Sequence, residues 1–160
     1  MRLLGRHNAA NAEAAYLACR EFGVTEAEAA RAAAGFEPLR HRLERAGMVR
    51  GALYVNDSKC TTVESMRAAL NSFDAPVVLL AGGKFKGGDL ASLAPLPRER
   101  ARAVPLFGAR REIFEQAWQG IVPLSWDADL GAAMARVGRL AESGDVVLMS
   151  PGTSSYDLYK

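Results

Sequence analysis

Two apolar runs, residues 77–80 and 146–149, constrain the fold of this chain most strongly. Neither run alternates between apolar and polar residues. Successive side chains of a strand point to opposite faces of a sheet, so a strand with one wet face alternates. A continuous apolar run is instead typical of a parallel strand that is covered on both faces. The two runs therefore predict a parallel sheet between two layers of helices.

The pattern between and around these runs alternates between strand and helix. Strands are predicted at residues 52–55, 77–81, 103–107, 121–123 and 146–149, and helices at residues 63–73, 110–118 and 128–142. This order predicts an α/β fold: a Rossmann-like open, mostly parallel sheet with helices on both faces.

The first part of the chain has a different pattern. An Ala-rich helix is predicted over residues 8–22, ending at Gly23. The capping-box pair Thr25 and Glu28 begins a second helix, which should stop near Gly35. Pro38 then breaks helical continuity. We therefore place a domain boundary here, with residues 1–38 as a short helical segment and residues 39–160 as the α/β domain.

Composition limits the possible classes of protein. A chain of 160 residues with 49% hydrophobic residues can build one compact core. A net charge of +2 gives no reason to expect a nucleic-acid or membrane partner, and no apolar run reaches membrane-spanning length. The two cysteines have neither metal-ligand spacing nor a disulfide framework, which favours a cytoplasmic protein with reduced thiols. Cys19 is expected to be buried in its helix.

Polar loops follow three of the predicted strands. They are residues 56–59, 82–89 and 150–155. In open α/β sheets, ligands bind at the carboxyl ends of the strands. Three polar loops at one edge predict a binding site there. The loop 82–89 is rich in Gly and Lys but has no P-loop pattern, and by itself it could be an ordinary strand-to-helix turn.

The loop after residue 55 has the clearest chemistry. Asp57, Ser58 and Lys59 lie between a strand and a helix, and Thr61 with Glu64 forms a capping-box pattern that predicts the helix start. A helix N-terminus offers free N–H groups and a positive dipole end, and Lys59 adds an ammonium group. This arrangement predicts binding of an anion such as a phosphate or a carboxylate.

The motifs resemble those of the Mur ligase family, in the branch that adds D-glutamate. Residues 56–62 resemble Asn-Asp-Ser-Lys-Ala-Thr-Asn, with Cys60 and Thr62 replacing the Ala and the last Asn. Residues 5–11 match Gly-x-His-Asn-x-x-Asn, residues 41–44 resemble His-Arg-Phe-Glu, and residues 82–86 match Gly-Gly-x-x-Lys. Residues 150–159 resemble Ser-Pro-x-x-x-Ser-x-Asp-x-Phe, with a Tyr at the last position.

The resemblance implies roles for individual residues. Asp57 and Lys59 are the expected catalytic residues. The nucleotide is expected to contact Asn8, Asn11, Arg42, Asp57 and Lys59. The incoming amino acid is expected to contact Thr61, Lys86, Ser150 and Tyr156. From residue type alone, the two asparagines could simply be helix caps. The implied cofactors are ATP and Mg²⁺, with the Mg²⁺ ligands in a central domain that this sequence lacks.

The resemblance also implies an activity. The intact enzyme would join D-glutamate to UDP-N-acetylmuramoyl-L-alanine through an acyl phosphate, in peptidoglycan precursor synthesis. Residues 1–38 would be the helical tail of the central ATPase domain, and residues 39–160 a C-terminal domain truncated at its end. The N-terminal and central domains would be its partners, and the chain alone is expected to be inactive.

Two alternatives stay open at this point. The chain could be a stand-alone anion- or nucleotide-binding α/β module without catalysis. It could also belong to a Mur-type ligase that adds a different amino acid.

Overall fold

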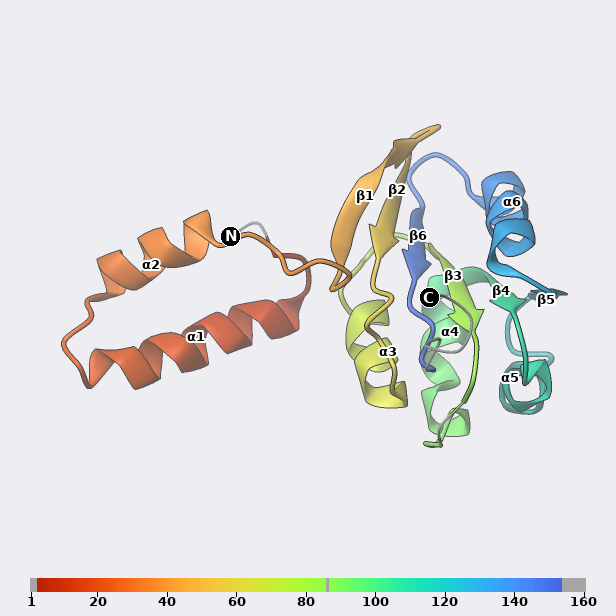
Figure 1. Ribbon diagram of the computed structural model, residues 1–160, viewed down its shortest axis with the longest axis horizontal. Helices are drawn as coiled ribbons and strands as arrows, with labels where there is room; N and C mark the ends of the chain where they lie inside the picture. The colour runs from red at the N-terminus through yellow and green to blue at the C-terminus, as the bar shows by residue number, and fades with distance from the viewer. Residues whose placement is uncertain (1–2, 86, 154–160) are drawn as a thin grey trace.

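The computed structural model, which describes residues 3–85 and 87–153, contains a six-stranded sheet with helices on both faces and a helical arm to one side (Figure 1). The strands are β1 (Glu44–Val49), β2 (Ala52–Asn56), β3 (Val77–Gly82), β4 (Ala101–Phe107), β5 (Leu124–Asp127) and β6 (Val146–Met149). The helices are α1 (Arg6–Arg20), α2 (Glu26–Gly35), α3 (Val63–Leu70), the 3₁₀ turn η1 (Ala91–Leu93), α4 (Pro95–Arg100), α5 (Arg111–Trp118) and α6 (Leu130–Leu140).

The sheet has the strand order β1-β2-β6-β3-β4-β5. Every pairing is parallel except that of β1 with β2, which is antiparallel. The predicted open, mostly parallel sheet is therefore confirmed. β2, β6 and β3 are neighbours, so the loops that follow them lie side by side at one edge of the sheet.

The two faces of β3 explain its unbroken apolar sequence. Val77, Leu79 and Ala81 pack into a core that contains Met66 of α3 and Phe114 of α5. The intervening Val78 and Leu80 pack on the opposite face against Ala133 and Val137 of α6. Because both faces are covered, every residue of β3 is buried.

Two strands differ from the prediction. Residues 121–123 were expected to form a strand, but β5 begins at Leu124. Residues 121–123 instead follow a turn at Gly120, which has φ of +77°. Pro123 contacts the neighbouring strand β4 through its carbonyl oxygen, which accepts a hydrogen bond from Val104 N (2.9 Å). β1 was not predicted, because this antiparallel edge strand is largely exposed and lacks an apolar periodicity.

Helix boundaries also differ. α3 ends at Leu70 rather than residue 73, and α6 spans Leu130–Leu140 within the predicted 128–142. α4 was not predicted at all, since its six residues contain two prolines and three charged side chains. No helix in the described part of the chain is long and apolar enough to cross a membrane.

The arm formed by α1 and α2 projects away from the sheet (Figure 1). Neither helix has a buried residue, and large apolar side chains such as Phe22 (90% exposed) and Phe36 lie open. Cys19 is exposed too, so the prediction that it is buried was wrong. The prediction treated the helix as part of a packed core, whereas α1 contacts mainly α2.

Candidate functional site

Backbone hydrogen bonds tie together the three loops at the carboxyl edge of the sheet. Asp57 N donates to Met149 O (2.8 Å), and Gly152 N donates to Cys60 O (3.0 Å). Gly82 N, at the end of β3, donates to Pro151 O (3.3 Å). The three polar loops predicted to share one edge are therefore in direct contact.

Glycine is required where β3 ends. Gly82 has φ of +131°, and a Cβ there would collide with the carbonyl oxygen of Phe107. The Gly82 carbonyl in turn accepts a hydrogen bond from the hydroxyl of Thr153. The close approach of these backbones fixes the loop after β3 against β4 and against the loop after β6.

Asp57 lies at the centre of this edge and is only 8% exposed. Its Oδ1 accepts a hydrogen bond from Leu43 N (3.2 Å), and its Oδ2 accepts one from the Ser150 hydroxyl (3.0 Å). Burial raises the pKa of the Asp57 carboxyl above its usual range, and these two hydrogen bonds oppose that rise. Asp57 thus joins the linker between α2 and β1 (residues 36–43) to the loop after β6.

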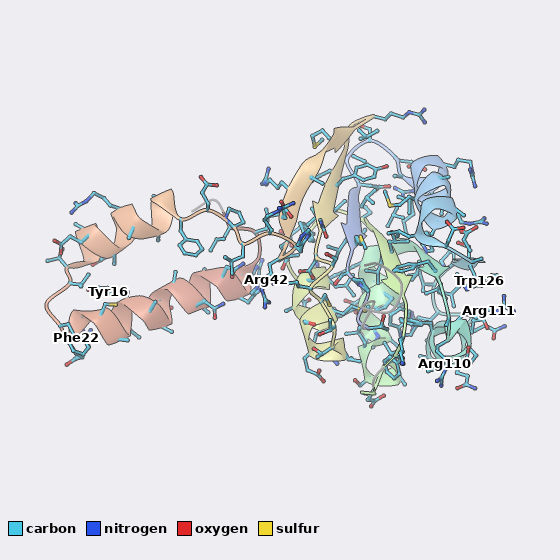
Figure 2. The ribbon with its side chains drawn as sticks, viewed as in Figure 1. Tyr16, Phe22, Arg42, Arg110, Arg111 and Trp126 are labelled. Carbon is cyan, nitrogen blue, oxygen red and sulfur yellow. The ribbon has the colours of Figure 1, made fainter. Side chains whose placement is uncertain are left out.

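Lys59 and Arg42 lie beside Asp57 on adjacent segments. Lys59 N donates to His41 O (3.1 Å), which holds the Lys59 loop against the linker that carries Arg42. Both cationic side chains are exposed. Figure 2 shows Arg42 at the junction of the arm and the sheet. The Arg42 charge therefore acts on the buried carboxylate, and Lys59 lines the same groove.

The start of α3 differs from the prediction. Thr62, rather than Thr61, is the N-cap: its hydroxyl accepts from Ser65 N (3.1 Å), and the Ser65 hydroxyl accepts from Thr62 N (3.2 Å). Ser65 therefore takes the place predicted for Glu64, which is one residue too early to close the box with Thr62. This leaves the half-buried Thr61 outside the cap and available for another role.

Cys60 is buried directly under the loop. Its Sγ lies 3.1 Å from the Ser65 hydroxyl. Burial raises the pKa of the Cys60 thiol above its ordinary value, so the thiol is protonated and packs as a small apolar side chain. Cys60 is therefore part of the support of the loop.

A groove of about 1060 Å³ runs between α1 and α2 along the arm, and its inner end reaches the carboxyl edge of the sheet. Its walls include all five residues predicted to contact a nucleotide: Asn8, Asn11, Arg42, Asp57 and Lys59. The arm contributes an apolar wall from side chains such as Tyr16 and Phe36. Residues scattered over more than fifty positions of sequence thus line one space.

The donors in the groove fit a nucleotide. The Arg42 guanidinium and the Lys59 ammonium suit phosphate oxygens. Asn11 presents an exposed amide, and Asn8 donates from Nδ2 to Leu4 O (2.6 Å), which leaves its Oδ1 as an acceptor.

A magnesium site is not formed by these residues. Within residues 3–85 and 87–153, no three His, Cys, Asp or Glu side chains group together as metal ligands. The carboxylates lining the groove are Asp57 and Glu28. Both oxygens of Asp57 already accept hydrogen bonds, and Glu28 Oε2 accepts two from Thr25.

The residues predicted to contact an amino acid are less fully described. Ser150 is fully buried behind Asp57, with its hydroxyl already donating to that carboxylate. Thr61 is half-buried next to Cys60. Lys86 and Tyr156 lie outside the described residues. The structure therefore brings the five nucleotide candidates together and leaves the amino-acid candidates as a prediction.

Sequence reasoning did not identify two contributors to this site. The apolar wall on the arm was missed because α1 and α2 are Ala-rich, so they show little contrast between faces. Asn56 was read only as part of a motif, although its side chain contacts His41 (Nδ2 to Nδ1, 2.9 Å). The sequence offered a signal only for the other contact of this side chain, since an Asn at a turn often accepts from the backbone two residues on, as Asn56 Oδ1 does from Ser58 N (3.0 Å).

The chain matches known proteins along its whole length. The UDP-N-acetylmuramoylalanine--D-glutamate ligase of Oleidesulfovibrio alaskensis is 65% identical over 157 residues, which cover 98% of this chain and 35% of that protein. The ligase of the same name from Lawsonia intracellularis is 57% identical over 158 residues, covering 99% of this chain and 36% of that protein. This chain thus spans about a third of the length of the curated relatives it matches.

Solved structures show the same fold. The UDP-N-acetylmuramate-alanine ligase of Thermotoga maritima superposes with a TM-score of 0.72 at 14% identity, over 96% of this chain and 36% of that one. The folylpolyglutamate synthase of Mycobacterium tuberculosis, solved with ADP and AMPPCP, also gives 0.72, at 17% identity, over 96% of this chain and 39% of that one. A family model described as the Mur ligase, glutamate ligase domain, matches residues 41–152. The chain therefore belongs to the Mur ligase family.

Proposed function

We propose that this chain is part of an ATP-dependent ligase that joins D-glutamate to UDP-N-acetylmuramoyl-L-alanine. The observation that carries the proposal is the groove, where five residues selected from sequence motifs line one space. Relatives of 57% and 65% identity that are named as D-glutamate ligases support the choice of substrate. The rest of such an enzyme would supply the remaining residues around the groove.

The residues of the groove divide the work by their chemistry. ATP supplies the phosphoryl group that activates the carboxylate of the precursor. Arg42 and Lys59 bind and orient phosphate oxygens, and the amides of Asn8 and Asn11 suit the edge of a base. Fixed positive charges at the site of phosphoryl transfer stabilise charge that develops there.

Asp57 acts through its neighbours. Since both of its oxygens accept hydrogen bonds from the chain, the carboxylate holds Leu43 and Ser150 in place. It also lies beside the positive charge of Arg42. We therefore propose Asp57 as a positioning residue, with Lys59 as the group that touches the substrate.

The amino acid would bind on the far side of Lys59. Thr61 is free of the helix cap, and its hydroxyl can bond a carboxylate at the start of α3. We propose Thr61, Lys86, Ser150 and Tyr156 as the side chains around D-glutamate. Ser150 can take part only by sharing the hydroxyl that now donates to Asp57.

The proposal can be tested with a chimeric protein, called the joined enzyme below. In it, this chain replaces the matched part of the Oleidesulfovibrio alaskensis ligase, and phosphate release is followed with UDP-N-acetylmuramoyl-L-alanine, Mg-ATP and one amino acid at a time. We expect release with D-glutamate. Release only with another amino acid would keep the ligase and overturn its substrate. No release from a folded joined enzyme, with anion binding by this chain alone, would favour a binding module.

A further inference from the structure

The linker before β1 is attached to the Lys59 loop at three points. The backbone carbonyl of His41 accepts from Lys59 N (3.1 Å), and Leu43 N donates to Asp57 Oδ1 (3.2 Å). The third contact joins two side chains, Asn56 Nδ2 and His41 Nδ1, at 2.9 Å. The linker leads from the arm into the sheet. These contacts therefore lie at the inner end of the groove, where Arg42, Asp57 and Lys59 line it.

The Asn56 side chain determines the state of the His41 ring. Asn56 Oδ1 accepts a hydrogen bond from Ser58 N (3.0 Å), which identifies Nδ2 as the atom that faces His41. An amide NH₂ can only donate. The contact thus requires His41 Nδ1 to accept, although Glu44 Oε2 also lies 3.8 Å from this nitrogen.

The backbone of the linker is held in an uncommon conformation. His41 has φ of +66° and Leu43 has φ of +44°. A bulky residue such as Leu is rarely found there, and such strain persists only where surrounding contacts enforce it. Here Glu44 Oε2 accepts from His41 N (2.8 Å), and Asp57 accepts from Leu43 N. The linker is therefore fixed by side chains.

We propose that His41 and Asn56 form a positioning pair that sets the place of Lys59 in the groove. Asn56 holds the loop through Ser58 N and the linker through His41 with the same amide group. Loss of either end removes one of the three attachments between the loop that carries Lys59 and the linker that carries Arg42, and so loosens the loop. The pair adds a structural detail to the proposed function. It rests on that proposal only for the role of Lys59 in catalysis.

Amide hydrogen exchange on the 160-residue chain tests positioning without any activity. His41→Gly keeps a left-handed backbone without strain and removes the acceptor. His41→Asn also tolerates this backbone and offers a side-chain oxygen near the position of Nδ1. We expect the Lys59 amide to exchange about tenfold faster in His41→Gly and at close to the parent rate in His41→Asn. Val55, in β2, is the internal control for global unfolding.

Equal exchange at Lys59 in the parent and His41→Gly would overturn the pair, as would an equal acceleration at Lys59 and Val55. The ¹⁵N shifts of the His41 ring give a second readout that needs no variant of His41. We expect the Nε2–H tautomer in the parent chain and the Nδ1–H tautomer in Asn56→Asp, whose carboxylate can only accept. An Nδ1–H tautomer in the parent would also overturn the pair.

Turnover by the joined enzyme connects the pair to catalysis. We expect His41→Gly to lower kcat about tenfold and His41→Asn to stay within about threefold of the parent, since small misplacements of a catalytic group cost large factors. Unchanged kcat in His41→Gly would overturn the catalytic part of the proposal. A parent joined enzyme without turnover would count against the proposed function alone, because the exchange and tautomer results do not depend on it.

Discussion

The hydroxyl of Ser150 donates a hydrogen bond to Asp57 Oδ2 at 3.0 Å, across 93 residues of sequence. This bond joins the loop after β6 to the loop after β2, and both oxygens of the buried carboxylate are thereby occupied. The edge of the sheet that faces the groove is thus built around a charge that is costly to bury. Its stability should depend on the ionisation of Asp57.

Asp57→Asn should change how stability depends on pH. Burial raises the pKa of Asp57 in the folded chain, so its contribution to stability is fully present below the unfolded pKa and is lost as pH rises through the folded pKa. An Asn can accept from Leu43 N and donate to the Ser150 hydroxyl without a charge. Relative to the parent, Asp57→Asn should therefore gain free energy of unfolding as the pH rises above the ordinary pKa of an Asp, measured by urea denaturation.

Asp74→Asn is the control for this series, because Asp74 is exposed. It removes the same charge without removing a buried carboxylate. If both variants change with pH by the same amount, the effect arises from net charge, and the account of Asp57 is wrong.

Thr62→Ala and Thr61→Ala should separate stability from substrate binding. Thr62 caps α3 and Thr61 does not. Loss of the cap should cost about 1 kcal/mol in free energy of unfolding, whereas Thr61→Ala should leave stability nearly unchanged. In the joined enzyme, Thr61→Ala should raise the KM for D-glutamate more than that for ATP. A larger loss of stability in Thr61→Ala would contradict the observed cap.

Gly82→Ala should destabilise the chain by about 3 kcal/mol or more. Its φ of +131° suits only glycine, and the new Cβ would collide with the Phe107 carbonyl. Gly138→Ala in α6 is the matched control, since nothing lies within 4 Å of its Cβ position. That change should stabilise the chain by about 0.5–1 kcal/mol. Thermal unfolding of the two variants measures both effects, and a tolerated Gly82→Ala would show that the loop can move away from β4.

Much of the sheet could be predicted from sequence, because buried parallel strands have a distinctive composition. The residues of β3 are apolar on both faces of the strand, which indicates that both faces are covered. β1 and β5 could not be predicted in the same way. Both are edge strands, β1 largely exposed and β5 mostly half-buried, so neither has the continuous apolar sequence of a buried strand.

The site was predictable in its residues but not in its contacts. Lys59 and Arg42 could be selected by charge and motif, and they do line one groove. The burial of Asp57 could not be foreseen, because it depends on Ser150 and Leu43, which approach it only in the folded chain. The cap at Thr62 was missed because Thr61 and Glu64 have the same spacing as Thr62 and Ser65.

Arg42→Ala in the joined enzyme should raise the KM for ATP about tenfold, since a hydrogen bond to a charged group contributes about 1.5–3 kcal/mol. Arg45→Ala is the control: Arg45 is also exposed, lies three residues further on in β1, and is not part of the groove wall. We expect it to stay within about twofold of the parent. Steady-state kinetics with varied ATP checks both variants, and equal effects would remove Arg42 from the nucleotide site.

A competition experiment tests the central claim most directly. The joined enzyme is incubated with UDP-N-acetylmuramoyl-L-alanine, Mg-ATP and equal amounts of D-glutamate, L-glutamate, D-alanine, L-lysine and diaminopimelate. The products are then identified by mass spectrometry and chiral analysis. We predict one product, the D-glutamyl amide, and its loss in Lys59→Ala. A product containing a different amino acid, or an undiminished yield in Lys59→Ala, would contradict the account.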